Sequence, residues 1–344
     1  MEKHEMELPS YIVIGSNLVD VIIERLRRHG FKYCIMITSK TPYRFYGSKI
    51  IERAEKAVVF SVWDINEAPD ELDRFVGEAR AADVVLGVGG GRVVDISKVI
   101  AELSGKPFFS IPTIASHDGI ASPMTSYRRD GRAYSRKSVM PSEIFADMDV
   151  ISIAPRRYLL SGCGDLVAKK SAVRDWWLAH KLTGEYYGRY AAHLAYLSAS
   201  VVIKSRKLIA NNSLEGIRTV VEALISAGVA MGVAGSSRPC SGSEHLIAHA
   251  LETLSEKPAL HGERCGVATI FTLYLHRGNW RKIKNSLAAM GAPHRIEHIN
   301  TDTDLFVEAV KKAPEIRPDR LTILHKMNLT RSEIVNILET TSLA

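Results

Sequence analysis

The stretch DVVLGVGGGRVVDISKVIAEL, residues 83–103, places an apolar run, a glycine-rich turn and a helical segment in direct succession. The run DVVLG at residues 83–87 is short and apolar, as strands buried on both faces are. The segment from Val94 to Leu103 has the spacing of a helix. Strand, glycine turn and helix in this order are typical of a parallel α/β sheet, so this stretch predicts the fold class.

The same alternation continues on both sides of this stretch. Helices without intervening strands follow from Pro155 onward. We therefore expect a Rossmann-like α/β domain of residues 1–153, its parallel sheet covered on both faces, and an all-α domain of residues 154–344. The expected strands are 11–15, 33–38, 57–61, 83–87 and 106–111, and the expected helices are 18–29, 70–80, 94–103, 155–182, 186–210, 213–231, 243–255, 264–291 and 301–313.

Composition is typical of a soluble globular protein, with 344 residues, 46% hydrophobic and 24% charged. No apolar run approaches the roughly 18 residues of a membrane span, and the charged N-terminus MEKHEMELPS is unlike a secretory signal. The four cysteines lack CxxC spacing, which argues against disulfides and a thiolate zinc site. The formal net charge of +7 comes from scattered basic residues. We expect a cytoplasmic homo-oligomer that binds no nucleic acid.

The glycine turn is a candidate phosphate site. Gly89, Gly90 and Gly91 let a backbone approach a phosphate closely, and the following helix offers its N-terminal N–H groups. Arg92 stands where the dinucleotide fingerprint GxGxxG has its third glycine, and the turn follows a late strand. A tight strand-to-helix turn without a ligand is therefore the alternative.

Two polar segments follow the strand at 106–111. The loop IPTIASHDGIASP, residues 111–123, carries hydroxyls and an aspartate where α/β proteins line ligand clefts, although an ordinary polar turn would look the same. The segment YRRDGRAYSRK, residues 127–137, surrounds the turn signal Asp130-Gly131 with basic residues. It predicts a basic hairpin that either lies in solvent or attracts an anionic substrate.

Histidines gather in SSRPCSGSEHLIAHALETLSEKPALHGERCG, residues 236–266. His245 and His249 are one helical turn apart on a helix that starts near Ser243, and His261 opens the next segment. Histidines from two helices can hold zinc, and ordinary core or surface histidines are the alternative. Asp165, in the glycine-rich GCGDLVAK of residues 162–169, is a candidate ligand or a helix N-cap.

Taken together, these motifs resemble the family of metal-dependent polyol dehydrogenases, which includes glycerol dehydrogenase, the iron-dependent alcohol dehydrogenases and, more distantly, dehydroquinate synthase. The likeness is strongest to the archaeal sn-glycerol-1-phosphate dehydrogenase branch, through ASHDGIASP and SGSEH. The segments that carry it are GVGGGRVVDISK (87–98), IPTIASHDGIASP (111–123), GCGDLVAK (162–169), SSRPCSGSEHLIAHALE (236–252) and HGERCGVAT (261–269).

The resemblance implies one zinc per subunit, bound by Asp165, His245 and His261. Spacing by itself would pair His245 with His249, and the family pattern instead leaves His249 beside the substrate. Asp118 and His249 are then candidates for orienting the substrate or passing a proton, and Asp165 lies within substrate reach. The implied reaction is reduction of dihydroxyacetone phosphate to sn-glycerol 1-phosphate for archaeal ether phospholipids, with zinc as Lewis acid and hydride from NAD(P)H.

The resemblance also implies how the cofactor is held. The three glycines would cradle the pyrophosphate, with Asp95 binding there or supporting the turn. The nicotinamide half would meet the hydroxyls of Thr113, Ser116 and Ser122. Strand 33–38 ends in Thr38-Ser39-Lys40 without an acid, so we expect NADPH to serve at least as well as NADH, with Thr38 near the ribose. A solvated loop at this strand end is the alternative.

The substrate phosphate needs cationic partners. The candidates are the hairpin from Arg128 to Lys137 and Arg238, which we expect on the side of the cleft. Two competing functions remain, a sister enzyme acting on unphosphorylated glycerol and a non-catalytic nucleotide-binding homologue.

Overall fold

The computed structural model describes the backbone of residues 3–55, 57–66, 68–129 and 132–344. The chain forms two compact units. The first unit comprises the residues up to Ala115 and Gly119–Pro155, and the second comprises Ser116–Asp118 and Arg156–Ala344. The chain passes from the first unit to the second after Pro155, close to the boundary expected after residue 153. Three residues of the 111–123 loop also belong to the second unit.

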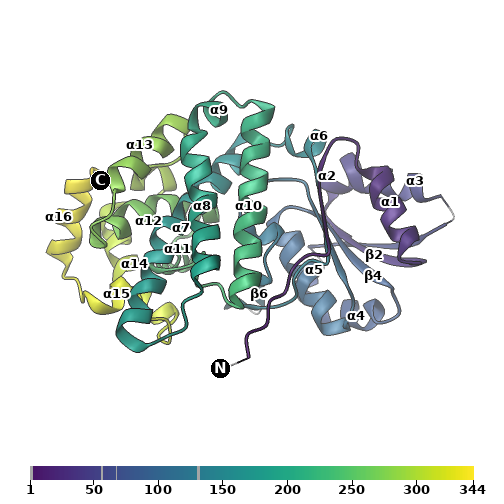
Figure 1. Ribbon diagram of the computed structural model, residues 1–344, viewed down its shortest axis with the longest axis horizontal. Helices are drawn as coiled ribbons and strands as arrows, with labels where there is room; N and C mark the ends of the chain where they lie inside the picture. The colour runs from purple at the N-terminus through teal and green to yellow at the C-terminus, as the bar shows by residue number, and fades with distance from the viewer. Residues whose placement is uncertain (1–2, 56, 67, 130–131) are drawn as a thin grey trace. The chain divides into compact units, whose positions relative to one another are not determined.

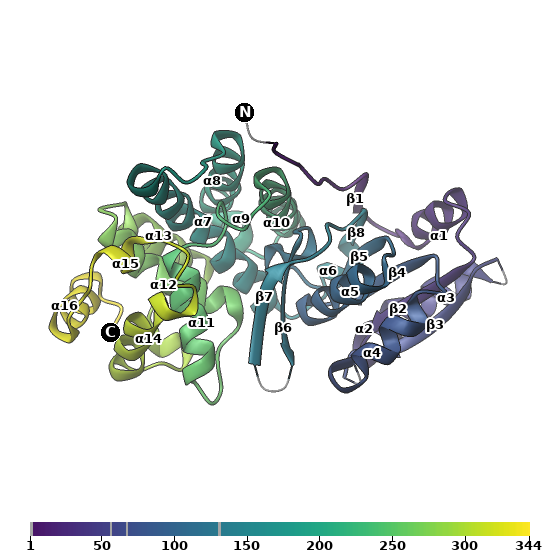
Figure 2. The same ribbon diagram turned by 90° about the horizontal axis from the view of Figure 1, so that it is seen from below.

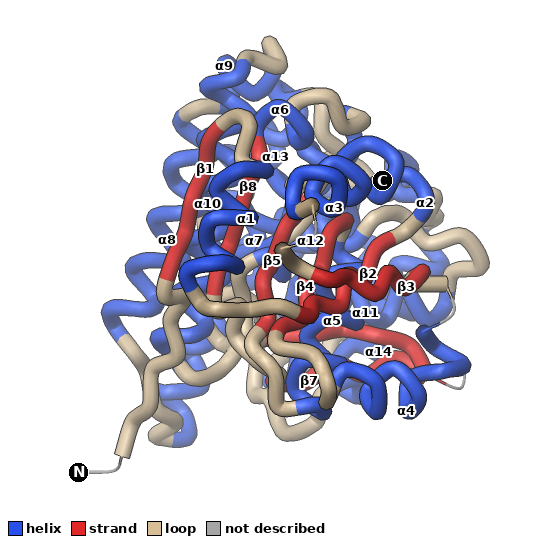
Figure 3. Tube along the Cα trace, turned by 90° about the vertical axis from the view of Figure 1, so that its right-hand side faces the viewer, coloured by secondary structure: helices blue, strands red, loops and turns tan. Residues whose placement is uncertain are grey.

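The first unit is built on a six-stranded sheet in which every strand pair is parallel, in the order β1-β8-β5-β4-β2-β3 (Figure 3). The glycine turn follows β4, which lies inside the sheet between β5 and β2. This confirms the predicted parallel α/β fold. The strands are β1 (Tyr11–Gly15), β2 (Tyr33–Thr38), β3 (Val59–Asp64), β4 (Val84–Gly89), β5 (Phe108–Pro112) and β8 (Glu143–Asp147).

Helices cover both faces of this sheet because its strands are apolar on both sides. On β2, Ile35 and Ile37 join the core under α4 (Ala68–Ala79) and α5 (Gly91–Ser104). The alternate residues of the same strand join the opposite core, under α1 (Val19–Arg28) and α3 (Ser48–Ala54). This alternation is the period of a β-strand, and it explains why the run YCIMIT has no polar face.

Strand β8 escaped the sequence prediction because Glu143 and Asp147 stand at its two ends, and acids are unfavourable in strands. Tertiary contacts compensate for both. Glu143 is fully buried and bonds to Arg25 and to His29 Nε2 at 2.6 Å. The chain also folds where no element was predicted, as α2 (Lys40–Pro42), the π-helix η1 (Tyr43–Gly47) and α3, and the strand expected at 57–61 lies two to three residues later as β3.

The basic hairpin forms as predicted, with β6 (Met124–Arg129) antiparallel to β7 (Arg132–Lys137) (Figure 2). The turn residues Asp130 and Gly131 lie outside the described residues, as do the side chains of residues 127–135. Two cations of the hairpin are paired with acids, Arg136 with Glu102 and Lys137 with Glu7, each at 2.6 Å. These pairs leave little charge at the base of the hairpin for an incoming anion.

The second unit is helical in its described residues (Figure 1). The segment 264–291, expected as one helix, forms two helices. Asn279 starts the second one as its N-cap, because its side chain accepts a hydrogen bond from Lys282 N at 3.0 Å. The helix expected at 186–210 is likewise interrupted at Ser205. The helices are α7 (Arg156–Thr183), α8 (Arg189–Lys204), α9 (Arg206–Ala210), α10 (Leu214–Ala234), α11 (Ser243–Leu254), α12 (His261–Leu275), α13 (Trp280–Met290), α14 (Thr303–Ile316), α15 (Ile323–Lys326) and α16 (Arg331–Thr341), preceded in the first unit by α6 (Met148–Ile151).

Helix α10 is long and apolar enough to cross a membrane by length and composition. Most of its apolar window is buried inside the protein, however, and α10 packs beside α8 (Figure 1). A core helix of a globular unit satisfies the same criteria, and α10 fits that description.

Candidate active site

Two long helices meet at glycines at the centre of the second unit. A Cβ on Gly164 of α7 would lie 2.1 Å from the carbonyl oxygen of Gly262, and a Cβ on Gly262 of α12 would lie 1.9 Å from that of Ser161. No side chain fits at either position, so the backbones of α7 and α12 touch directly. This close crossing brings the residues next to the glycines, Asp165 and His261, toward one another.

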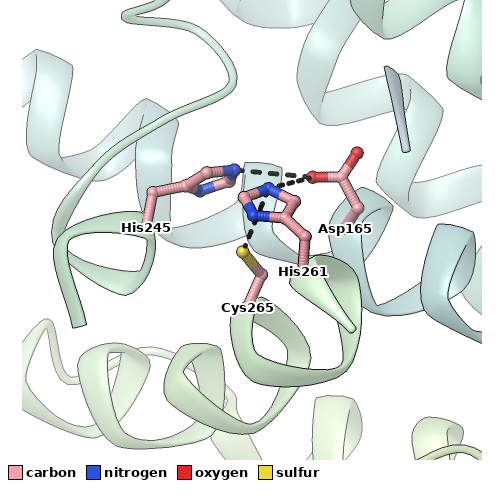
Figure 4. A group of neighbouring side chains, drawn as sticks. All are labelled: Asp165, His245, His261 and Cys265. Atoms are coloured by element: carbon pink, nitrogen blue, oxygen red, sulfur yellow. Dashed lines mark hydrogen bonds and ion pairs between the residues drawn. The ribbon is translucent and has the colours of Figure 1, made fainter. Parts of the chain in front are cut away.

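Asp165 lies inside α7, nine residues after the helix begins at Arg156. The interpretation of this aspartate as a helix N-cap is therefore wrong, because the glycines before it serve helix packing and do not start the helix. The side chain is buried, and its Oδ2 accepts a hydrogen bond from the backbone N–H of Asp118 at 2.9 Å. Its other oxygen, Oδ1, faces two histidines (Figure 4).

His245 is oriented by the residue before it. Its Nδ1 lies 2.8 Å from Glu244 Oε1, and the carboxylate can only accept, so Nδ1 carries the proton. The same Glu244 oxygen accepts from Gly242 N at 2.8 Å, which ties the carboxylate to the start of α11. The Nε2 atom is left to point at Asp165 Oδ1, 3.4 Å away. A carboxylate behind a histidine in this way is the usual support of a metal ligand.

His261 and Cys265 come from the first two turns of α12. Glu263 caps this helix by accepting from Leu260 N at 2.9 Å, which fixes the direction of the turn. His261 Nε2 lies 3.9 Å from Asp165 Oδ1 and 3.6 Å from Cys265 Sγ. Burial above all, and the neighbouring His245, hold the pKa of His261 well below its usual range. The imidazole is therefore neutral, as a metal ligand must be.

Four donor atoms converge in this cluster, from Asp165, His245, His261 and Cys265, and all lie within 4.8 Å of one another (Figure 4). Tetrahedral zinc with bonds of about 2.0–2.3 Å holds its donor atoms roughly 3.3–3.6 Å apart. The observed separations of 3.4, 3.6 and 3.9 Å are close to those edges. The donor set and its spacing therefore fit a borderline divalent metal such as zinc.

His249 stands beside this cluster but does not belong to it. Its ring centroid is 6.4 Å from that of His245 and 5.7 Å from that of His261. Its Nδ1 lies 3.8 Å from Glu252 Oε2. Burial is the largest cause that lowers the pKa of His249, so its ring is neutral near pH 7. The sequence suggested His245 with His249 by spacing, whereas the fold brings His245 to His261.

Lys169 is a candidate functional residue that the sequence prediction passed over. It is fully buried, and its Nζ lies 2.8 Å from Asp165 Oδ1 and 2.7 Å from Asp118 Oδ2. Burial would lower the pKa of Lys169, but the two carboxylates outweigh it and raise that pKa well above its usual range. Burial would likewise raise the pKa of Asp165, and Lys169 with the histidines holds it well below its usual range.

The ion pairs of Lys169 with Asp118 and Asp165 place Asp118 next to the metal-binding group, which is the cluster of Asp165, His245, His261 and Cys265. The segment 116–118 is fastened to α7 by Lys169 and by Ser161 Oγ, which donates to the Ser116 carbonyl at 3.1 Å. His117 lies against His261, with ring centroids 6.1 Å apart. The four-residue spacing of Asp165 and Lys169 on one helical face was the available sequence signal for this pairing.

The glycine turn has the form expected of a phosphate site. Gly90 is the N-cap of α5, and no described side chain caps that helix end. A Cβ on Gly89 would lie 2.7 Å from Val93 Cγ2, and one on Gly90 would lie 2.7 Å from Ile114 Cδ1. The turn therefore stays narrow only with glycine, and the N–H groups of the first turn of α5, which begins at Gly91, remain for an anion.

Three other residues expected to bind cofactor, Asp95, Thr38 and Ser122, already have structural partners. The Asp95 carboxylate accepts from Ser126 N at 3.3 Å and lies 3.6 Å from Lys98 Nζ. Thr38 is buried and its hydroxyl donates to the Val88 carbonyl at 2.8 Å, which links β2 to β4. Thr113 follows β5 and is mostly buried, and the Ser122 hydroxyl is engaged with Met124 in a local turn.

Arg238 is occupied by structural contacts. It is buried and forms an ion pair with Glu185, and its Nη1 donates to the Leu321 carbonyl at 2.9 Å. These contacts disfavour the predicted role of Arg238 in steering the phosphate, because its guanidinium already joins three segments of the helical unit.

A doubly covered parallel sheet with a glycine turn, and a helical unit that gathers Asp, His and His, fit a metal-dependent dehydrogenase. The family described as iron-containing alcohol dehydrogenase matches residues 13–155. A glycerol dehydrogenase from Schizosaccharomyces pombe has a similar fold, with a TM-score of 0.80 at 20% identity over 99% of this chain and 91% of that one.

Closer relatives narrow the family. The chain is 43% identical to the glycerol-1-phosphate dehydrogenase [NAD(P)+] of Pyrococcus furiosus, over 95% of this chain and 96% of that protein. It is 44% identical to the enzyme of the same name from Staphylothermus marinus, over 99% and 98%. The chain belongs to the glycerol-1-phosphate dehydrogenase family.

Proposed function

We propose that the protein is an NAD(P)-dependent glycerol-1-phosphate dehydrogenase, which reduces dihydroxyacetone phosphate to sn-glycerol 1-phosphate. Near-full-length identity of 43–44% to relatives of that name carries the proposal. The cluster of Asp165, His245 and His261 supports it, since an oxygen and two nitrogens in one place suit a catalytic zinc. Such an enzyme would supply the backbone of ether phospholipids, and we expect it in the cytoplasm as a homo-oligomer.

The residues of the site have separable tasks in this reaction. Asp165, His245 and His261 would hold one zinc, which supplies Lewis-acid polarisation of the substrate carbonyl when bound. Cys265 adds a fourth donor within reach, although the reaction needs one position open for substrate. Lys169 keeps Asp165 ionised and holds Asp118 beside it.

His249 and Asp118 are the groups positioned to serve the substrate. The neutral His249 lies beside the metal-binding group and is the candidate to hydrogen-bond a substrate hydroxyl or to pass the proton that the reduction consumes. The Asp118 carboxylate is 14% exposed and pairs with Lys169, so it is held in place to orient a substrate hydroxyl.

The test is an assay of NADH and NADPH oxidation with dihydroxyacetone phosphate, followed by chiral analysis of the product. We expect turnover, a strong preference for the phosphorylated substrate over dihydroxyacetone, and sn-glycerol 1-phosphate as the product. Activity with glycerol and none with dihydroxyacetone phosphate would instead identify a glycerol dehydrogenase. No turnover by protein that contains zinc would indicate a non-catalytic homologue.

A further inference from the structure

Arg264 on α12 is a buried cation with unmet hydrogen-bonding capacity. The residue is 4% exposed, and its Nη2 donates to Glu252 Oε2 at 3.0 Å. Its Nε and Nη1 are buried and have no hydrogen-bond partner among the described residues. Two of the three guanidinium nitrogens therefore hold N–H groups that nothing in the described chain accepts.

Such donors are costly in a folded protein. A guanidinium stays charged at every working pH, and burying its N–H groups without acceptors forfeits their hydration. Buried polar groups are almost always satisfied, so an exception calls for a physical account. An acceptor that arrives with a ligand is one such account, and it requires that Arg264 stand next to the substrate site.

Its surroundings meet that requirement. Arg264 follows His261 by three residues on the same helix, and its partner Glu252 lies 3.8 Å from His249 Nδ1. After burial, which is the largest cause, the Arg264 charge also contributes to lowering the pKa of both His249 and His261. Arg264 is thus adjacent to His261, which belongs to the metal-binding group, and to His249, which lies beside that group.

Two other buried cations of the second unit are already engaged. Lys169 Nζ lies between Asp118 and Asp165, and all three nitrogens of Arg238 have partners in Glu185 and Leu321. Within the described residues, the Arg264 guanidinium donates to Glu252, and its buried Nε and Nη1 have no acceptor.

We propose that Arg264, anchored by Glu252, forms the anion subsite that receives the phosphate of the substrate. This rests on the proposed function and specifies how that site selects a phosphate monoester. A three-carbon substrate places its carbonyl and its phosphate only a few atoms apart, so the anion subsite must adjoin the metal-binding group, as Arg264 does. Arginine suits a phosphate because its planar, weakly hydrated cation donates directionally to several oxygens.

The experiment compares Arg264→Met with wild type on dihydroxyacetone phosphate and on dihydroxyacetone, each with NADH and with NADPH. We expect kcat/KM for the phosphorylated substrate to fall on the order of 10- to 100-fold, as for loss of charge-assisted hydrogen bonds. We expect kcat/KM for dihydroxyacetone to change less than about threefold. Inhibition by inorganic phosphate against dihydroxyacetone, and its calorimetric binding to the zinc-loaded enzyme, should weaken in parallel.

The matched control is Arg157→Met. Arg157 also bonds to a carboxylate of α12, with Nε and Nη2 each 2.7 Å from Glu263, but its side chain is 61% exposed, so water can accept from its remaining N–H groups. The Arg157→Met variant should leave the preference for the phosphorylated substrate unchanged. Arg264→Lys, which keeps the charge and loses the fork, should recover part of the lost preference and serves in place of Arg264→Met if that variant does not fold.

Several outcomes would overturn the inference. A wild-type preference that survives unchanged in Arg264→Met and Arg264→Lys would show that another group holds the phosphate. Equal losses of kcat/KM on both substrates, together with a lower zinc content, would show that Arg264 has only a structural role. A loss confined to NADPH would assign the subsite to the 2′-phosphate of the cofactor. Absence of any preference in the wild type would instead count against the proposed function itself.

Discussion

Asp175 holds the helix that carries His245, and replacing it with asparagine should weaken both the fold and metal binding. The carboxylate is fully buried on α7 and accepts four hydrogen bonds. Two come from Ser243 at the start of α11, from N at 2.7 Å and from Oγ at 2.5 Å. The others come from His276 Nε2 at 2.9 Å and from Ile323 N, at the start of α15, at 2.7 Å.

The magnitude follows from these four bonds. An asparagine has one acceptor oxygen, so its amide group must face either Ser243 or the pair of His276 and Ile323. Facing Ser243 is the cheaper choice, because that hydroxyl can turn to accept, and only the Ser243 N–H is orphaned, at about 1–3 kcal/mol. The other bonds lose their charge assistance, at roughly 1 kcal/mol each. We expect a loss of about 3–5 kcal/mol in the free energy of unfolding, as when one partner of a buried ionic pair is removed.

Urea unfolding of metal-free and zinc-loaded protein measures this, with zinc content determined alongside. Asp304→Asn is the matched control, since Asp304 is 76% exposed and pairs with Arg331 at the surface. We expect the control to change stability by less than about 0.5 kcal/mol. Because Ser243 lies two residues before His245, Asp175→Asn should also lower the affinity for zinc. A loss below about 1 kcal/mol in Asp175→Asn would refute this account of the buried carboxylate.

Three further predictions concern the site. Alanine at each of the proposed ligands, Asp165, His245 and His261, should remove the metal, as measured by elemental analysis. His249→Ala should keep the metal and lose turnover. Zinc that is retained in the three ligand variants and lost in His249→Ala would reverse the assignment. The pKa of Glu252 is lowered from 4.5 to about 2, first by His249 and then by Arg264, although partial burial opposes this shift. The ionised Glu252 therefore contributes fully to stability above about pH 4.5, and this contribution is lost as the pH falls toward 2. Metal-free wild type should therefore lose more stability than Glu252→Gln between pH 5.5 and 3, and parallel urea midpoints for the two proteins would contradict this. Ser39→Asp, next to the strand end of β2, should lower kcat/KM for NADPH on the order of tenfold more than for NADH, and equal losses would show that this strand end does not contact the ribose.

Sequence patterns are sufficient to predict the architectural class of both units. Apolar runs without polar faces, as in YCIMIT, can only be strands covered on both sides, and β2 alternates between two buried cores accordingly. The glycine run predicted a strand-to-helix turn, and Gly90 is the N-cap of α5. Short-range patterns of this kind suffice for element type and order, because they depend on periodicity and backbone freedom along one segment.

Tertiary structure alone decided where charged groups have partners. Strand β8 could not be predicted because Glu143 is compatible with a buried strand only once Arg25 and His29 reach it. Spacing could not choose between His249 and His261, since the choice depends on the glycine contact that sets α7 against α12. The contacts of Lys169 and Arg264 could not be predicted from sequence either. The free energy of a buried charge depends on what surrounds it in space, and residues distant in sequence supply those surroundings only after folding.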